Sequence, residues 1–350
     1  MKERKITHIY WFAYYDTRSP SVRYRGKHPL AFARKNFRIK SYLIIPGYHP
    51  KHIFLFIKAY LKAMLFKSKS SLVVIQRVQS GFIYAHLLKI LVRFRRRNTI
   101  YDLDDADYLQ YPPETIDYFA RHCAFISCGS EAIAKHYAKI NPSVRHITSP
   151  IVDLNLVKRS RNTIFTIGWV GGFEWGHRNS MSDILFPAVA SLGFPCKLKL
   201  LSVNLPNDRS MIANYFSKYP HVQLEMPESI HWEDEVEVQK QILTFDVGIA
   251  TLSESPVHQA KSGIKVKQYL NNGVPVISSN LRENNRIVQD GFNGFLCTSS
   301  EDFKEALTCF KNMDETEYTR FSGNARKSGQ NFNHQRYFEA LGNLICYTFD

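Results

Sequence analysis

Short apolar runs alternate with longer amphipathic stretches along almost the whole chain. The apolar runs have the length of buried strands, and the stretches between them, such as 80–93 and 130–139, have helical periodicity. The fold class predicted by this alternation is α/β, with two doubly wound parallel-sheet (Rossmann-like) domains. The expected strands are Ile6–Phe12, Tyr42–Ile45, Leu72–Ile75, Thr99–Leu103, Phe125–Cys128, Arg145–Thr148, Phe165–Val170, Lys197–Ser202, Val222–Glu225, Val247–Thr251, Val274–Ser278 and Gly294–Cys297.

The strand pattern breaks near 150–162, and residues after 301 have helical patterns without a further strand. A chain of 350 residues exceeds the usual size of one compact core. We therefore expect domains at 1–155 and 156–330, followed by a helical segment at 331–350.

The formal charge of +15 is confined to the first half of the chain. Residues 1–158 hold 27 basic and 10 acidic residues, whereas the remainder holds 19 basic and 21 acidic residues. This asymmetry predicts an anionic partner for the first half: nucleic acid, phospholipid headgroups or an anionic substrate. The six cysteines form no C-x-x-C pair and the 13 histidines form no H-E-x-x-H, so we expect no metal site.

The segment 49–70 combines an apolar run with a stripe of lysines, at Lys51, Lys58, Lys62 and Lys69. This pattern is typical of a helix that lies on an anionic membrane surface, to which Arg93, Arg95, Arg96 and Arg97 could add. A core helix whose lysines extend to solvent fits the segment equally well, and the charge of the domain favours the membrane. No signal peptide or transmembrane run is expected, and the six scattered cysteines suit a reducing cytoplasm, so we expect a cytoplasmic protein on the inner face of the membrane.

Ligands of open α/β sheets bind beyond the carboxyl ends of the strands, so residues at these ends are the candidates for a site. The stretch Lys261–Ile277 reads as a helix, a turn and a strand, with Lys261, Ser262 and Lys265 crowded at the helix start. Unpaired N–H groups and ammonium groups there suit a phosphate. An ordinary basic helix start has about the same weight.

A glycine pair, Gly171 and Gly172, ends the first strand of the second half, where a phosphate could approach the backbone. His177 and Arg178 follow closely, and Arg178 is the candidate diphosphate contact. A plain tight turn is the alternative for the glycine pair.

Acidic side chains cluster at the end of the strand Thr99–Leu103, in an otherwise basic domain. Alternation places Asp102 and Asp104 on one face, and Asp105 begins the loop. They could orient sugar hydroxyls, act as a base or hold Mg²⁺, or they could cap a helix and pair with a local arginine. Arg23 and Arg25, after the first strand, could hold a phosphate or carboxylate, or lie on a basic surface loop.

Taken together, these segments resemble the glycosyltransferase group 1 proteins (family 4), retaining nucleotide-sugar transferases of the GT-B fold. The matching segments, in order, are Tyr101–Ala106, Ile151–Asp153, Ile167–Gly172, Phe245–Ala250, Lys261–Ile277 and Ile287–Leu296. The resemblance spans nearly the whole chain, and the order and spacing of the segments make it specific.

The resemblance implies two domains that face a cleft. The domain 156–330 would bind a UDP- or GDP-sugar, the domain 1–155 the acceptor, and the helix near 331–348 would pack back on the first domain. The donor contacts would be Gly171, Gly172, Arg178, Lys261, Ser262, Lys265 and Gln268, and the acceptor contacts Arg23, Arg25, Asp102 and Asp104. Cationic groups would stabilise the leaving diphosphate without a metal or other cofactor.

The chain departs from the family at Ala260 and Gln268, which stand where two glutamates are usual. Gln268 can still bind ribose hydroxyls through neutral hydrogen bonds, whereas Ala260 loses the usual sugar contact. Asp105 is the candidate catalytic carboxylate, and His122 is one option for a catalytic histidine in the first domain.

The sequence thus predicts a peripheral membrane hexosyltransferase that acts on a glycan or glycolipid acceptor, with retention of configuration. An epimerase of the same fold, a non-catalytic GT-B subunit and a nucleic-acid-binding protein are the alternatives. We expect no nucleic-acid partner, since no nucleic-acid motif is found and the lysines interleave with a long apolar face.

Overall fold

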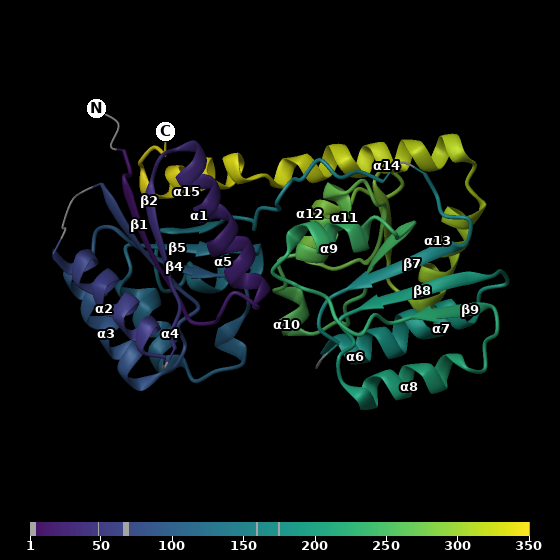
Figure 1. Cartoon of the computed structure of the whole chain (residues 1–350), viewed down its shortest axis with the longest axis horizontal. Helices are drawn as coiled ribbons and strands as arrows, with labels where there is room; N and C mark the ends of the chain where they lie inside the picture. Colours follow the sequence, from purple (N-terminus) through teal and green to yellow (C-terminus); the bar gives the residue numbers. More distant parts are fainter. Residues whose placement is uncertain (1–4, 48, 66–69, 159, 174–175, 350) are drawn as a thin grey trace. The chain divides into compact units, whose positions relative to one another are not determined.

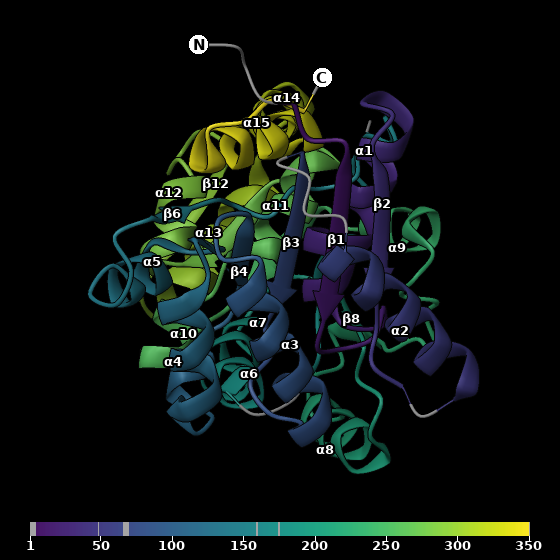
Figure 2. The ribbon, with the colours of Figure 1, turned by 90° about the vertical axis from the view of Figure 1, so that its left-hand side faces the viewer.

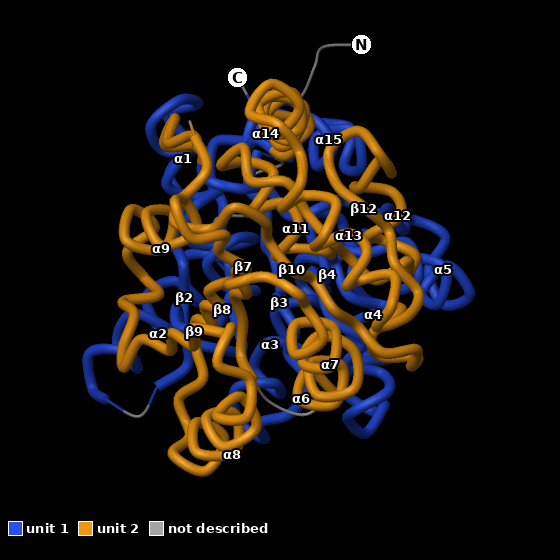
Figure 3. The backbone as a smooth tube through the Cα atoms, turned by 90° about the vertical axis from the view of Figure 1, so that its right-hand side faces the viewer, with its two compact units in different colours: residues 1–152, 260–262, 333–350 blue, residues 153–259, 263–332 orange. Residues whose placement is uncertain are grey.

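The structure, a computed structural model, describes residues 5–47, 49–65, 70–158, 160–173 and 176–349. The chain divides into two compact units (Figures 1 and 3). Unit 1 comprises 1–152, 260–262 and 333–350, and unit 2 comprises 153–259 and 263–332. Each unit holds one six-stranded parallel sheet, which confirms the predicted fold class. The functional domains predicted at 1–155, 156–330 and 331–350 stay a prediction.

The sheet of unit 1 has the order β2-β1-β3-β4-β5-β6. Its strands are β1 (His8–Ala13), β2 (Lys40–Ile44), β3 (Ser71–Gln76), β4 (Thr99–Leu103), β5 (Phe125–Cys128) and β6 (Val144–His146). Its helices are the π-helical turn η1 (Val22–Lys27), α1 (His28–Asn36), α2 (Pro50–Leu65), α3 (Phe82–Phe94), the 3₁₀ turn η2 (Asp107–Leu109), α4 (Pro113–His122), α5 (Glu131–Tyr137) and α15 (His334–Ile345).

Strand residues of unit 1 alternate between two apolar cores. Tyr10 and Phe12 of β1 point to the core under α2, α3, α4 and α5, whereas Ile9 and Trp11 point to the core under α1 and α15. Figure 2 shows α2, α3 and α4 side by side on one face of this sheet. Burial on both faces explains why these strands read as continuous apolar runs. The last helix, α15, belongs to unit 1, where the Phe338 ring lies 6.2 Å from the Phe32 ring.

The sheet of unit 2 has the order β12-β11-β10-β7-β8-β9. Its strands are β7 (Phe165–Val170), β8 (Cys196–Leu201), β9 (Val222–Glu225), β10 (Val247–Ala250), β11 (Val276–Ser279) and β12 (Gly294–Cys297). When the six strands of unit 2 are numbered by their order in the chain, their order across the sheet is 6-5-4-1-2-3, the strand order of the dinucleotide-binding fold. The direction of winding reverses between β7 and β10, and ligands of such sheets bind at that reversal.

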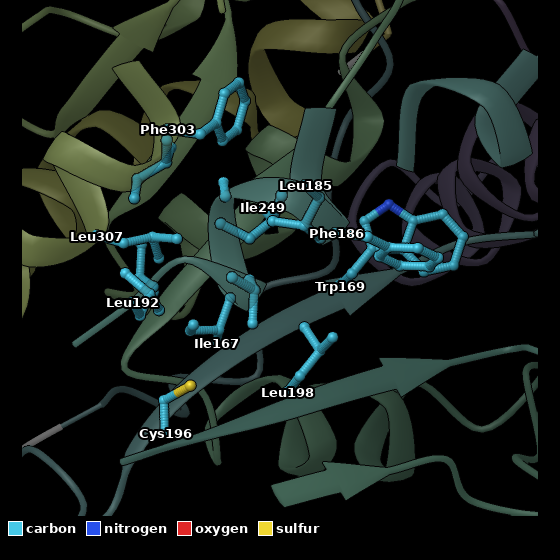
Figure 4. Close-up of a cluster of buried hydrophobic side chains, with 14 of the residues drawn as sticks. Ile167, Trp169, Leu185, Phe186, Leu192, Cys196, Leu198, Ile249, Phe303 and Leu307 are labelled. Carbon is cyan, nitrogen blue, oxygen red and sulfur yellow. The ribbon is translucent and has the colours of Figure 1, made fainter. Parts of the chain in front are cut away.

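The helical elements of unit 2 are α6 (Gly176–Ser180), the π-helical turn η3 (Met181–Leu185), α7 (Phe186–Ala190), α8 (Pro206–Phe216), α9 (Glu235–Ile242), α10 (Pro256–Gln259), α11 (Ile264–Asn271), α12 (Arg282–Ile287), α13 (Ser300–Asn312), α14 (Glu315–Gly329) and the 3₁₀ turn η4 (Gln330–Phe332). A buried cluster around Ile167, Leu198 and Phe186 fills one face of the sheet (Figure 4). Trp169, near the end of β7, belongs to the same cluster.

All twelve predicted strands are present, and five of them have the predicted bounds: β4, β5, β7, β9 and β12. One local prediction was wrong. The helix of the lysine-rich segment begins at Ile264, because Gly263 at its N-cap has a positive φ of 66°. Lys261 and Ser262 therefore precede α11, and Lys261 cannot share a helix face with Lys265.

Candidate functional site

Arg25 and Asp102 form a buried ion pair at the strand ends of unit 1. The Nη2 and Nε atoms of Arg25 donate to the two carboxylate oxygens of Asp102 at 2.6 and 2.9 Å. Arg25 also donates to Ser127 Oγ at 2.7 Å and to the Ile147 carbonyl at 2.7 Å. The guanidinium is fully buried, so it joins η1, β4, β5 and the segment after β6 through satisfied hydrogen bonds. This environment favours a role in holding the strand ends.

A second arginine, Arg77, gathers the other carboxylates of the acidic segment. Its guanidinium lies 2.7 Å from Asp105 Oδ2 and 2.6 Å from Asp107 Oδ1, and 3.8 Å from Asp104 Oδ1. Arg77 follows β3, and β3 pairs with β4, which places the guanidinium beside the acidic loop. Lys261 also belongs to unit 1, and its Nζ lies 2.7 Å from Asp105 Oδ1. Asp105 thus has one cation at each carboxylate oxygen.

Asp104 and Asp105 ionise differently because their surroundings differ. Burial raises the pKa of Asp104 to about 6, since the attraction of Arg77 at 3.8 Å only partly offsets the loss of water. Burial also acts to raise the pKa of Asp105, but Lys261 and Arg77 outweigh it and lower this pKa to about 2. Asp104 Oδ1 has no hydrogen-bond partner among the described residues. Between a pH of about 2 and a pH of about 6, Asp105 is therefore ionised whereas Asp104 is protonated.

The structure does not connect the remaining predicted residues of unit 1 to this cluster. His122 ends α4, where its Nδ1 lies 2.8 Å from the Tyr118 carbonyl and its ring stacks on Tyr118. Arg23 is buried, and it donates to the Arg18 carbonyl at 2.5 Å. Ser262 packs near the same face of Gly129 as Asp104, because a Cβ on Gly129 would meet Ser262 Cβ at 3.4 Å and Asp104 Cβ at 2.8 Å, but within the described residues its hydroxyl makes no hydrogen bond to the acidic cluster.

The winding reversal of unit 2 holds a second cluster, centred on Lys265. The Lys265 ammonium lies 2.8 Å from His177 Nε2 and 5.3 Å from the centre of the Trp169 ring. Gly171, which follows β7 with a positive φ of 145°, leaves room for this side chain, since a Cβ there would meet Lys265 Cε at 2.3 Å. A cation is thus held directly at the carboxyl end of β7, the place where nucleotide phosphates bind in such sheets.

The other predicted donor contacts differ in position. A Cβ on Gly172 would meet nothing within 4 Å, so only Gly171 of the pair is required to be glycine. The Arg178 guanidinium lies 2.6 Å from Asp208 Oδ1, at the start of α8. Gln268 is buried on α11, and Ala260 is buried in the apolar core of unit 1.

Sequence reasoning missed Arg77 altogether and ranked Arg178 above His177. The available signal for Arg77 was a charged residue directly after a buried strand, at the edge where the carboxylates were already expected. Within the described residues, no group of three or more His, Cys, Asp or Glu side chains could hold a metal ion.

The architecture of the two units is that of the GT-B glycosyltransferase fold. No known family profile matches the sequence, and no curated protein matches it significantly. Solved structures match along nearly the whole chain. HepE from Anabaena in complex with UDP and glucose superposes with a TM-score of 0.69 at 14% identity, over 96% of this chain and 98% of HepE.

A glycosyltransferase from Rickettsia africae superposes with a TM-score of 0.68 at 12% identity, over 97% of this chain and 99% of the other. The lipopolysaccharide outer core galactosyltransferase WaaB gives 0.61 at 14% identity, again over 97% and 99%. Identities this low show a common fold, and the expected GT-B architecture is thereby confirmed.

Proposed function

We propose that this protein is a retaining glycosyltransferase that moves a hexose from a UDP- or GDP-sugar to a glycan or glycolipid. The observation that carries the proposal is the position of Lys265 over the glycine end of β7, at the winding reversal of a sheet with dinucleotide-binding order. The similarity in fold to HepE, whose structure contains UDP and glucose, supports the choice of a nucleoside diphosphate sugar.

The proposed role of Lys265 is to neutralise the charge that develops on the leaving diphosphate. A fixed ammonium stabilises this charge best in a site where it needs no rearrangement, and Trp169 and Gly171 fix it here. Of the other donor contacts expected from the sequence, we keep Ser262 and Gln268, with Gly172 and Arg178 at the margin of the site, whereas the Lys261 ammonium is bound to Asp105 of the proposed acceptor site. The cations of the chain then perform the task for which other transferases use a metal ion.

The proposed acceptor site is the acidic loop of unit 1. Asp105 stays ionised at all physiological pH values and can accept hydrogen bonds from acceptor hydroxyls, with Lys261 and Arg77 fixing its orientation. Asp104 is the neighbouring carboxyl group that can hold or release a proton near neutrality. We propose that three buried side chains support the acidic loop from inside unit 1: Arg23, Arg25 and Asp102. His122 remains one option for a further acceptor contact.

We further propose that unit 1 binds an anionic membrane surface, on the inner face of the cell membrane, through the apolar surface of α2 and α3. Nine of the fourteen large apolar side chains exposed in the described chain lie on these two helices: Ile53, Phe54, Leu55, Ile57, Leu61, Leu65, Phe82, Ile83 and Phe94. Such a concentration on one surface marks an interaction site. No helix among the described residues is long and apolar enough to cross a membrane.

The two helices present this surface together because they pack in parallel. The Phe56 and Tyr84 rings lie 5.3 Å apart, and Tyr60 Oη donates to the Leu87 carbonyl one turn further on. Lys58 lies over the Phe54 ring at 5.9 Å, which places positive charge beside the apolar surface. Arg95, expected on the same surface, is instead buried on Ser71 and Ala63, and Lys69 lies outside the described residues.

Vesicle flotation tests the membrane proposal. Wild-type protein should float with phosphatidylglycerol-containing vesicles and not with pure phosphatidylcholine vesicles. The double variant Phe54→Ser/Phe82→Ser should stay at the bottom of the gradient. The control Leu205→Ser/Val236→Ser removes two exposed apolar residues of unit 2 and should float like the wild type. Equal flotation of both double variants would contradict the proposal.

The donor proposal is tested by thermal shifts with UDP, GDP, ADP, CMP and their common sugars, followed by transfer assays with the sugar that binds. Binding stabilises the folded protein by mass action, so one nucleotide should raise the Tm, and Lys265→Ala should abolish the effect. A sugar converted without an acceptor would indicate the epimerase. No shift with any nucleotide would favour a non-catalytic GT-B subunit, for which buried Ala260 is the supporting observation.

A further inference from the structure

The sequence predicted Arg178 as the diphosphate contact near the end of β7. The side chain that lies beside Lys265 there is the neighbouring residue, His177. The Arg178 guanidinium pairs with Asp208 of α8 at 2.6 Å, so its charge is balanced by this carboxylate. His177, by contrast, lies 2.8 Å from the Lys265 ammonium through Nε2. An ammonium group can only donate, so His177 Nε2 accepts, and the neutral ring carries its proton on Nδ1.

The imidazole of His177 is held in this orientation from several sides. Its ring stacks on His258 at 5.4 Å and 20°, and it meets the Trp169 ring edge to face at 6.2 Å. Gly176 permits the close approach of His258, since a Cβ there would meet His258 Nε2 at 2.6 Å.

His258 and the backbone of His177 are fixed in turn. The backbone N–H of Ser253 donates to His258 Nδ1 at 3.1 Å. The hydroxyl of Ser180 lies 3.1 Å from the His177 carbonyl and 3.3 Å from the Thr251 carbonyl, which ties α6 to the end of β10. The imidazole is therefore anchored to both strands at the winding reversal.

We infer that His177 is the positioning residue of the donor site: neutral His177 orients the Lys265 ammonium toward a nucleoside diphosphate, and protonation of His177 weakens binding. This inference rests on the proposed function for the identity of the ligand. A protonated imidazole cannot accept from Lys265, and two cations 2.8 Å apart repel each other. The ammonium then leaves the position over Gly171, and the diphosphate loses a charge-assisted hydrogen bond.

The groups around His177 determine the direction of this effect. Lys265 of α11 faces Nε2, and His258 of α10 faces the ring. Arg178, on the same helix as His177, is paired with Asp208 of α8. Lys265 opposes a positive charge on His177, because two like charges at hydrogen-bond distance repel each other.

Calorimetric titration with UDP-glucose at pH 7.5 and 5.5 tests the inference. UDP-glucose is chosen because it lacks the terminal phosphate monoester of UDP, whose own second pKa is about 6. The wild-type Kd should be higher at pH 5.5 than at pH 7.5, and the loss should reach about tenfold when His177 is fully protonated, as expected for the loss of one hydrogen bond to a charged group. His177→Ala should bind about tenfold more weakly than the wild type at pH 7.5.

Two further variants separate positioning from a merely structural role. In His177→Gln the amide oxygen can accept from Lys265 but does not titrate, so binding should be restored and should not change between the two pH values. His231→Gln, the same change at an exposed histidine of unit 2, should keep the wild-type pH dependence. Wild-type affinity in His177→Ala, or wild-type pH dependence in His177→Gln, would overturn the inference.

The pairing itself can be measured without any donor. The ¹⁵N spectrum of the ligand-free protein at pH 7.5 should show an unprotonated Nε2 for His177, assigned by its loss in His177→Gln and shifted in Lys265→Met. A protonated Nε2 would overturn the inference. If UDP-glucose does not bind the wild type while the spectrum shows the expected tautomer, the UDP donor of the proposed function fails and the His177–Lys265 pairing stands.

Discussion

Replacing Asp104 by asparagine should stabilise unit 1 at neutral pH and have little effect at acid pH. Burial raises the pKa of Asp104 from 3.8 to about 6, so the folded protein binds this proton more tightly than the unfolded chain does. Folding stability therefore falls as the pH rises from about 4 to about 6, and the full cost of the ionised group is present above that range. Asparagine has nearly the same shape and carries no charge.

The size of the effect follows from the shift. A difference of about two pKa units, at about 1.4 kcal/mol each, gives Asp104→Asn a gain of about 3 kcal/mol at pH 7.5 relative to pH 4. The close approach of Gly129, whose added Cβ would meet Asp104 Cβ at 2.8 Å, keeps the side chain buried and prevents it from escaping to water.

Hydrogen exchange at the amides of β3, β4 and β5, measured at pH 4 and 7.5 with correction for intrinsic rates, isolates unit 1 from unit 2. Asp105→Asn is the control of opposite sign. The lowered pKa of Asp105 in the wild type contributes folding stability that is present above about pH 3.8 and lost as the pH falls through about 2. The Asp105→Asn variant should therefore be less stable than the wild type at pH 7.5. An Asp104→Asn effect that is the same at both pH values would refute the reasoning.

Three further outcomes are expected. Gly171→Ala should weaken donor binding at least about tenfold in calorimetry, because its Cβ would displace Lys265, whereas Gly172→Ala should bind normally. Arg95→Met should destabilise unit 1 by about 2–3 kcal/mol in urea unfolding, since buried acceptors on Ser71 and Ala63 lose a charged donor; an unchanged midpoint would contradict this. Asp302→Asn, which replaces the carboxylate of the α13 capping box by a neutral amide, should cost up to about 1 kcal/mol at pH 7, and the cost should vanish in thermal scans as the pH falls through about 2.

The strands could be predicted from the sequence because both faces of each sheet are covered. A strand buried on both faces reads as a continuous apolar run, and its end is visible where the run stops. The acidic loop after β4 and the glycine end of β7 were located in this way. The start of α11 was misplaced because the lysines suggested a helix, while Gly263, with its positive φ, was the residue that marked the boundary.

Contacts between side chains could not be predicted in the same way. Arg77 lies about thirty residues before the carboxylates that it binds, and only the pairing of β3 with β4 brings them together. Periodicity identifies strands but does not give their order in the sheet. The choice between His177 and Arg178 depends on the phase of a five-residue helix, and neighbouring residues of a helix point about 100° apart.

The two clusters place different chemical groups at the strand ends, and this difference is the physical basis for proposing different ligands for them. In unit 1, Lys261 and Arg77 are bound to carboxylates, so their charge is used within the protein and the cluster presents carboxylate oxygens. Such oxygens suit the hydroxyl groups of a sugar. In unit 2, the Lys265 ammonium lies beside an imidazole, an indole ring and a glycine backbone at the end of β7. A cation at the carboxyl end of the first strand of such a sheet suits a phosphate group, which is the physical reason for proposing the diphosphate at unit 2 and the sugar hydroxyls at unit 1.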